Sequence, residues 1–425
     1  MFLKKNRIFW EEAICVMEQV KEITEKKKWT HPRHAWITNT LRFLGTGLVE
    51  RLYGVKVETF KEQGDRAYLI LLNHQTPFDQ FFVAIAFRDA VYYMATEDIF
   101  SLGWLSDALR WLVAPIPIRK QTTDIQSVMN CIRVAREGGT IAIAPEGNRT
   151  YSGRTEYMNP AIAGLIKKLK LPVALFRIEG GYGVEPRWSD VKRRGKMRAY
   201  VSRVIEPEEI AAMSKEELYR AVQEGLDVRE DCLSGKFRHK KLAEYMERAI
   251  YVCPFCGLAE FHSQGDLLTC KSCGRQVRYL PTKELEGVGF DFPFPFFYQW
   301  YEYQKDYVNS FDSTAHVDVP LFRDTARLSE VLLYKRKKLL RKSASFCLYG
   351  DRVVIDEGRS QELVLHFDQV TAASCLGRNK LNLYHGDMVY QVKGSKRFNA
   401  LKYVNLFFRY KNLKKGDENV KFLGL

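Results

Sequence analysis

Long apolar runs are absent from this sequence of 425 residues. A helix that crosses a bilayer needs roughly 18 to 20 consecutive apolar residues. The longest apolar stretches here, such as 68–72 and 111–118, are far shorter. The basic residues 1–5 are followed by Glu11 and Glu12 and not by the apolar core of a secretory signal. We therefore predict no transmembrane helix and a cytoplasmic location.

Acidic residues are fewer than basic ones. The chain has 51 Asp and Glu against 66 Lys and Arg, which gives a formal net charge of +15 at pH 7. This excess favours anionic partners, such as phospholipid headgroups, nucleotide phosphates or nucleic acid, without choosing among them. A composition of 46% hydrophobic and 28% charged residues excludes a disordered or collagen-like chain. The length predicts about two to four domains.

Cysteine is too scattered for a disulfide framework, since five of the nine residues are isolated. The other four form two Cys-x-x-Cys pairs, Cys253 with Cys256 and Cys270 with Cys273, separated by thirteen residues. This is the spacing of a four-thiolate zinc ribbon, and a glycine follows each pair, as tight turns at the metal require. We predict a closed, structural zinc site in a reducing compartment. A pair of redox dithiols is the alternative.

Short apolar runs alternate with helical patterns between residues 67 and 207. This alternation predicts an α/β fold in which helices flank a sheet. Strands are expected near 67–72, 112–118, 140–144, 172–178 and 197–205, and helices over 77–88, 98–109, 123–137 and 160–170. Ser214 followed by Glu217 predicts a capping box at the start of one further helix.

Amphipathic helices are expected before this region, over 7–28 and 35–53. The second helix either packs on the α/β core or lies in a lipid interface. A basic helical stretch over 236–250 is expected to lead into the Cys pairs. Residues 286–305 are rich in aromatic rings, which either pack between domains or anchor the chain at a headgroup region.

The last ninety or so residues are expected to form a small β-rich domain. Strands are predicted over 345–348, 352–355, 363–367, 380–384 and 388–392, and a helix over 398–410. Antiparallel strands followed by one terminal helix resemble a pleckstrin-homology or GRAM-like barrel. This resemblance is one of topology alone.

Polar residues follow the strand expected at 67–72, in the run Asn73-His74-Gln75-Thr76-Pro77-Phe78-Asp79. Thr76 suits a helix N-cap and Pro77 the first helical position. Asp79 either caps the helix by reaching back to the Thr76 amide, or orients the His74 imidazole as a general base. In the second case His74 must lie in the loop before the helix, because residues five apart on one helix diverge by roughly 140°.

Two further loops carry candidate binding residues. The run Ala144-Pro145-Glu146-Gly147-Asn148-Arg149-Thr150 follows the strand expected at 140–144. Gly147 allows close backbone approach, and the guanidinium of Arg149 matches a phosphate or carboxylate. The alternative is an ordinary turn with a surface arginine. Arg119 and Lys120 follow another strand and suit a phosphate.

Together these blocks resemble the glycerophospholipid acyltransferase family, the 1-acylglycerol-3-phosphate or PlsC-like acyltransferases. The resemblance covers roughly residues 60–207. The blocks of the family appear here as His74 with Asp79, then Arg119, then Glu146-Gly147-Asn148-Arg149, then Leu171-Pro172-Val173. Asn148 stands where the family commonly has Thr, and Leu175-Phe176-Arg177 replaces a proline-rich ending.

The resemblance implies a glycerol-3-phosphate acyltransferase-like sheet and an O-acyltransferase of phospholipid biosynthesis. It implies that His74 deprotonates the acceptor hydroxyl and that Asp79 orients the imidazole. It also implies that the acceptor is bound by Arg119, Glu146, Gly147 and Arg149. The acceptor is expected to be a lysophospholipid, typically 1-acyl-sn-glycerol-3-phosphate. The donor is expected to be acyl-CoA or acyl carrier protein, used at a membrane surface.

An alternative interpretation is a zinc-ribbon module that binds nucleic acid or protein, fused to a non-catalytic lipid-binding domain. The cations that flank the Cys pairs keep this interpretation open: Arg238, Lys240, Lys241, Arg275 and Arg278. On the first interpretation nucleic acid is not an expected partner. The predicted domains are 1–60 (amphipathic helices), 61–230 (acyltransferase), 231–285 (zinc ribbon), 286–330 (aromatic connector) and 331–425 (β-rich, PH/GRAM-like).

Overall fold

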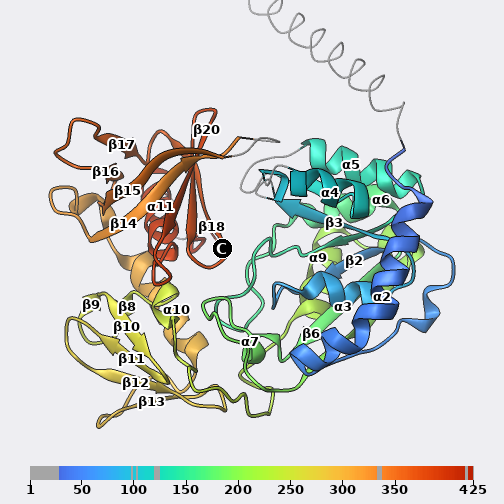
Figure 1. The fold of residues 1–425 in the computed structure, drawn as a ribbon, viewed down its shortest axis with the longest axis horizontal. Coiled ribbons are helices and arrows are strands. Elements are labelled where there is room, and N and C mark those ends of the chain that lie inside the picture. The colour runs from blue at the N-terminus through green and yellow to red at the C-terminus, as the bar shows by residue number, and fades with distance from the viewer. Residues whose placement is uncertain are drawn as a thin grey trace, which may run out of the picture.

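The chain has three parts that follow one another in sequence (Figure 1). The computed structural model describes residues 28–96, 99–101, 104–118, 125–332, 337–416 and 420–424. A helix-flanked α/β sheet stands on one side, with the small Cys-containing β region and a curled antiparallel sheet on the other. These parts confirm the predicted fold class. The helix expected over 7–28 lies outside the described residues.

In the described residues, the α/β sheet has seven strands in the order β1-β7-β6-β2-β5-β3-β4. The strands are β1 (Val55–Val57), β2 (Leu69–Leu72), β3 (Val91–Thr96), β4 (Ile116–Ile118), β5 (Thr140–Ile143), β6 (Val173–Glu179) and β7 (Met197–Ile205). Neighbours are parallel except β6 and β7. The carboxyl ends of β2 and β5 therefore reach the same edge of the sheet.

Helices cover both faces of this sheet. They are α2 (Pro32–Tyr53), α3 (Asp79–Ala86), α4 (Trp104–Val113), α5 (Ile125–Arg136), α6 (Ala161–Leu169), α7 (Gly181–Val184), α8 (Pro207–Ala212) and α9 (Lys215–Leu226). Side chains alternate along β2, so Leu69 and Leu71 pack in the core with α5, α6 and α9. Ile70 and Leu72 pack in the core with α3. Burial on both faces explains why β2 is a continuous apolar run.

Two predicted elements of this part need correction. The strand expected over 112–118 is limited to Ile116–Ile118, because α4 continues through Val113. The helix expected from residue 77 begins at Asp79, because Phe78 has the non-helical angles φ −115° and ψ 12°. The capping box at Ser214 and Glu217 is confirmed, with both of its hydrogen bonds present.

The Cys-containing region is a small β structure. Its strands are β8 (Val252–Cys253), β9 (Gly257–Leu258), β10 (Phe261–Gln264), β11 (Leu267–Cys270), β12 (Gln276–Tyr279) and β13 (Leu285–Gly287). The helix predicted over 236–250 is wrong, since only the short 3-10 turn Met246–Arg248 forms there. The main chain of Arg238 pairs with Arg194 of the α/β part, and Tyr245 adopts a left-handed φ of 72°. These tertiary bonds and that φ angle are incompatible with a continuous helix.

The aromatic segment 286–305 packs inside the molecule. It leads into α10 (Phe297–Ser310), on which Phe297, Trp300 and Tyr301 are buried. Phe290, Phe292 and Phe294 before the helix are partly buried against the same core. This burial favours packing over a headgroup anchor.

The third part is a curled antiparallel sheet. Its strand order is β17-β16-β15-β14-β20-β19-β18. The strands are β14 (Phe322–Glu330), β15 (Lys338–Leu348), β16 (Arg352–Ile355), β17 (Leu363–His366), β18 (Val370–Leu376), β19 (Lys380–His385) and β20 (Met388–Gly394), followed by helix α11 (Leu401–Lys414). β14 and β18 were not predicted. β14 begins at Phe322, ahead of the predicted domain limit at 331, and the limits of the domains stay a prediction.

Replacement of Ser214 by Ala should lower the free energy of unfolding by about 1 kcal/mol. Ala cannot accept the bond that the Glu217 amide donates to Ser214 Oγ, at 3.1 Å. Urea unfolding followed by tryptophan fluorescence measures the change. Ser214→Asp keeps an acceptor at the cap and should remain close to the unmodified protein. Equal losses in both variants would contradict the capping role.

Candidate active site

His74 and Asp79 lie together at the carboxyl end of β2. His74 Nδ1 is 2.8 Å from Asp79 Oδ2, and the Asp79 side chain is only 1% exposed. His74 lies in the loop and Asp79 is the first residue of α3, as a contact across five residues requires. The carboxylate holds Nδ1, so Nε2 is the nitrogen that can exchange a proton with a substrate.

Asp79 also organises the loop backbone. Its Oδ2 accepts a hydrogen bond from the Gln75 amide at 2.7 Å, and its Oδ1 accepts from the Thr76 amide and hydroxyl at 2.9 and 2.7 Å. The predicted bond from the Thr76 amide to Asp79 is present, together with the contact to His74. It does not cap the helix, because α3 begins at Asp79 with Phe78 as its N-cap, so the predicted positions of Thr76 and Pro77 at the helix start are wrong. These four bonds compensate for the loss of water around a buried charge.

The Glu146–Arg149 loop is bonded directly to the main chain of His74. The His74 amide donates to Glu146 Oε1 at 3.0 Å, and the His74 carbonyl accepts from the Thr150 amide at 3.0 Å. Glu146 Oε2 accepts from the Glu156 amide at 2.9 Å. Glu146 is thus a buried residue that holds the loop carrying His74. Its predicted role in binding the acceptor stays a prediction.

The Glu146–Arg149 loop turns at Gly147, and the carboxyl group of Glu146 is buried within it. Gly147 has a φ of 67°, a left-handed angle that glycine adopts without strain. Burial raises the pKa of Glu146 to about 8, although the His74 and Glu156 amides act in the opposite direction. Desolvation therefore outweighs two backbone hydrogen bonds.

Arg149 comes three residues after Glu146 and is the cation that the sequence predicted for this loop. Its Nη1 atom is buried and has no hydrogen-bond partner among the described residues. Burial, together with the charges of Arg187 and Arg378, lowers the pKa of Arg149 to about 10. Arg119, the other predicted cation, lies outside the described residues.

Sequence reasoning missed two basic residues at this edge. Arg187 is 3% exposed and donates to the Arg149 carbonyl at 2.9 Å. The Lys192 ammonium lies 4.0 Å from the centre of the Tyr53 ring and 4.9 Å from that of Phe78. Neither residue belongs to a recognisable motif. Both lie in the segment after α7, which packs beside the loops of His74 and Arg149.

The segment that holds both loops is similar to known proteins. Residues 54–176 match the family model described as Acyltransferase, and this range contains both His74–Asp79 and Glu146–Arg149. The chain carries an acyltransferase domain. Among solved structures, it is similar to the 1-acyl-sn-glycerophosphate (LPA) acyltransferase PlsC of Thermotoga maritima. The identity is 21%, the match covers 45% of this chain and 77% of that chain, and the TM-score is 0.39. No curated protein matches the chain.

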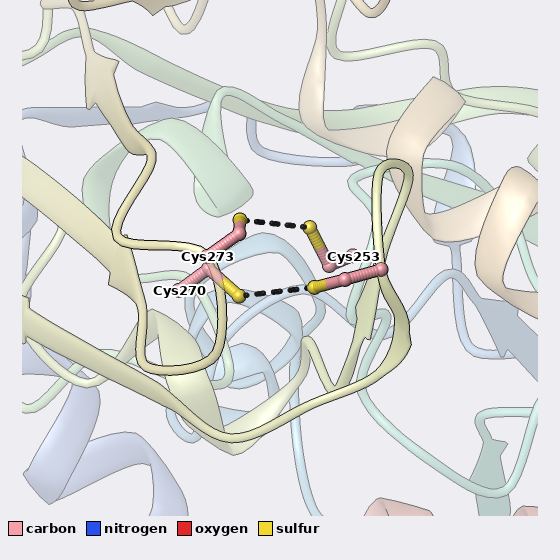
Figure 2. Close-up of side chains that lie close together, drawn as sticks. Cys253, Cys270 and Cys273 are labelled. Atoms are coloured by element: carbon pink, nitrogen blue, oxygen red, sulfur yellow. Dashed lines mark hydrogen bonds between the residues drawn. The ribbon is translucent and has the colours of Figure 1, made fainter.

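The four predicted metal ligands converge in the small β region, away from the acyltransferase loops. Their ligand atoms all lie within 4.8 Å of one another. Cys253 Sγ lies 3.8 Å from Cys273 Sγ, and Cys256 Sγ lies 3.6 Å from Cys270 Sγ. Figure 2 shows the side chains of Cys253 and Cys273 pointing toward each other. A disulfide is excluded, because its sulfurs would be about 2.05 Å apart. The cluster is a candidate metal site.

A pH series on Glu146→Gln tests the buried carboxyl group. Its pKa in the folded state is about 8, against an ordinary value of 4.5, so the folded chain binds this proton more tightly. The resulting stabilisation is full below about pH 4.5 and is lost as the pH rises towards 8. We therefore expect the free energy of unfolding of the unmodified protein to fall, relative to that of the variant, between about pH 5 and 8.

Urea unfolding at several pH values measures this difference. Glu224→Gln, on the exposed face of α9, is the matched control and should follow the unmodified protein at every pH. A difference between Glu146→Gln and the unmodified protein that is constant across this range would contradict the raised pKa.

Proposed function

We propose that the chain is an O-acyltransferase acting on a lysophospholipid. The acyl group comes from a thioester on coenzyme A or acyl carrier protein, and 1-acyl-sn-glycerol-3-phosphate is the first candidate acceptor. The observation that carries the proposal is the His74–Asp79 pair, joined at 2.8 Å inside a segment that matches the Acyltransferase family.

The proposed reaction needs one base. His74 Nε2 takes the proton of the acceptor hydroxyl, and the oxygen attacks the carbonyl carbon of the thioester. The tetrahedral intermediate then collapses, the carbon–sulfur bond breaks, and the imidazolium returns its proton to the thiolate. Asp79 stabilises the imidazolium between these steps. The products are the acylated lipid and the free thiol.

Positive charge beside the base supports a phosphate-bearing acceptor. Arg149 offers a buried donor, and Lys192 lies over the Phe78 ring in the loop that carries His74. A guanidinium and an ammonium are the usual protein partners of phosphate. Predicted binding by Arg119 and Gly147 remains part of the proposal.

Exposed apolar side chains on two helices support work at a membrane surface. Phe43 on α2 is 88% exposed and Trp104 on α4 is 80% exposed, and Trp36, Leu44 and Trp111 are also exposed. The two helices contact each other, with Arg33 of α2 bonded to the Trp111 carbonyl of α4. Such a surface suits the interfacial layer of a bilayer. No helix among the described residues has the length and apolar character to cross one.

We propose zinc for the cysteine cluster. A tetrahedral site with Zn–S bonds of about 2.3 Å has sulfur–sulfur edges of about 3.8 Å. The Cys253–Cys273 and Cys256–Cys270 sulfur separations, 3.8 and 3.6 Å, fit that size. Four thiolates close the coordination shell, so the ion would hold the two turns together and would not bind substrate.

His74→Ala should lower the rate of acyl transfer by about 10²–10⁴-fold, the usual contribution of a positioned base, while the protein stays folded. The assay follows labelled acyl groups from acyl-CoA or acyl carrier protein to lysophosphatidate in vesicles. His262→Ala, an exposed histidine on β10, is the control and should keep full activity. Unchanged turnover in His74→Ala would refute the proposed base.

Metal analysis of the purified chain should find about one zinc ion per molecule. Cys256→Ser should lose the ion, because three thiolates cannot complete the shell. Cys232→Ser is the matched control, since Cys232 is exposed and outside the cluster, and this variant should retain the metal. Equal metal content in the two variants would rule out the cluster as the binding site.

A further inference from the structure

Three arginines from two parts of the molecule gather beside the candidate active site. Arg149 lies in the Glu146–Arg149 loop, Arg187 follows α7, and Arg378 lies in the turn between β18 and β19. Arg187 bridges the parts, since it donates to the Arg149 carbonyl at 2.9 Å and to the Cys375 carbonyl of β18 at 3.4 Å. The C-terminal sheet thus reaches the acyltransferase domain at this loop.

The turn that carries Arg378 is held in place on both sides. Asn379 Nδ2 donates to the carbonyls of Gly394 and Ser395, at 3.2 and 2.9 Å. Arg378 itself pairs with Glu185, and its Nη1 lies 3.4 Å from Asp190. The guanidinium is therefore presented from a fixed turn.

Glu185 links this turn to the residues around His74. The Tyr53 hydroxyl donates to Glu185 Oε2 at 2.9 Å. The Tyr53 ring lies 5.3 Å from the ring of Phe78, in the loop that carries His74. Arg378 is thus three contacts from the Phe78 ring, through Glu185 and Tyr53.

Two of the three arginines in this cluster have no direct ion pair among the described residues. Arg378 pairs with Glu185 and Asp190, and Asp190 is also held by Arg248 through bonds of 2.7 and 3.0 Å. The charges of Asp79 and Glu185 act on Arg149 from a greater distance, and Glu156 and Arg187 interact in the same way. The lack of a direct ion pair at Arg149 and Arg187 favours an anionic ligand such as a phosphate ester.

Donor atoms in the cluster lack acceptors. Arg149 Nη1 and Arg378 Nε are buried and have no hydrogen-bond partner among the described residues. Buried donors without an acceptor are rare and costly in proteins, and they gain most from a charged acceptor. A phosphate oxygen supplies such an acceptor.

We propose that the β18–β19 turn completes a phosphate site, in which Arg378 and Arg149 bind a phosphate ester of a substrate and Arg187 holds the two parts together. The proposal rests on the proposed acyltransferase function. Two substrates carry the required group, a lysophosphatidate acceptor and the coenzyme A of the donor. Arg378 is a binding residue supplied from outside the acyltransferase domain.

The test compares Arg378→Gln with the unmodified full-length chain on four substrates. Lysophosphatidate is set against monoacylglycerol, which lacks the phosphate. Acyl-CoA is set against the acyl thioester of N-acetylcysteamine, which also lacks phosphate. We expect KM to rise about tenfold or more for one phosphate-bearing substrate, a loss of about 1.4 kcal/mol, with kcat and both phosphate-free substrates little changed. The substrate that shows the effect identifies the source of the phosphate.

Two further variants separate binding from structure. Arg378→Lys keeps the charge without the planar fork, and should restore part of the lost affinity. Arg359→Gln removes an exposed arginine of the same sheet and should leave KM unchanged. Equal losses by Arg378→Gln on phosphate-bearing and phosphate-free substrates would show a structural contact only and overturn the proposal.

A binding experiment distinguishes failure of this proposal from failure of the proposed function. If the unmodified chain transfers no acyl group, calorimetric titration with sn-glycerol 3-phosphate still tests the site. Binding that Arg378→Gln weakens about tenfold supports the phosphate site without the reaction. No binding to the unmodified chain, or equal binding to both proteins, overturns it.

Discussion

The main chain of His74 is held by hydrogen bonds to Glu146 and Thr150, and the rest of the candidate active site depends on these bonds. The His74 amide donates to Glu146 and its carbonyl accepts from Thr150, while the imidazole is held by Asp79. Backbone and ring are therefore both restrained before any substrate arrives, as pre-organised catalysis requires. The two charged residues of the Glu146–Arg149 loop therefore differ in position: Glu146 holds the main chain of His74, and Arg149 provides a buried cation.

Part of this site could be predicted from the sequence, because its geometry is local. His74 and Asp79 are five residues apart, and Thr76 and Pro77 indicate the turn that brings them together. The hydrogen bond from the His74 amide to Glu146 could not be predicted, since it depends on the parallel register of β2 with β5, in which Leu69 pairs with Ile141. Arg378 could not be predicted either, because no motif surrounds it and only the packing of the third part brings it near.

In the fold, too, elements determined by local sequence patterns could be predicted, and those determined by tertiary contacts could not. The strand β2 could be predicted because burial on both faces makes it a continuous apolar run. The capping box at Ser214 could be predicted because a local pair of hydrogen bonds determines it. β14 was not predicted because buried and more exposed positions are interspersed along it and the exposed ones are polar or charged, so the strand has no apolar run. The stretch 236–250 has a helical composition, yet its backbone bonds to other segments, and tertiary contacts outweigh propensity.

The Cys-containing region also contacts the site, through a buried ion pair. Lys283, in the turn between β12 and β13, lies 3.4 Å from Glu230 Oε2, and both side chains are almost fully buried. Glu230 Oε1 accepts from the Gly180 amide at 2.6 Å, and the Tyr182 amide donates to Gln75, the neighbour of His74. Breaking a buried pair by removing one partner is strongly destabilising. Gly180, which precedes α7, is therefore held from the Cys-containing region, and α7 in turn contacts Gln75 through Tyr182. The Cys-containing region and the C-terminal sheet thus each contact segments that border the loops of the acyltransferase domain.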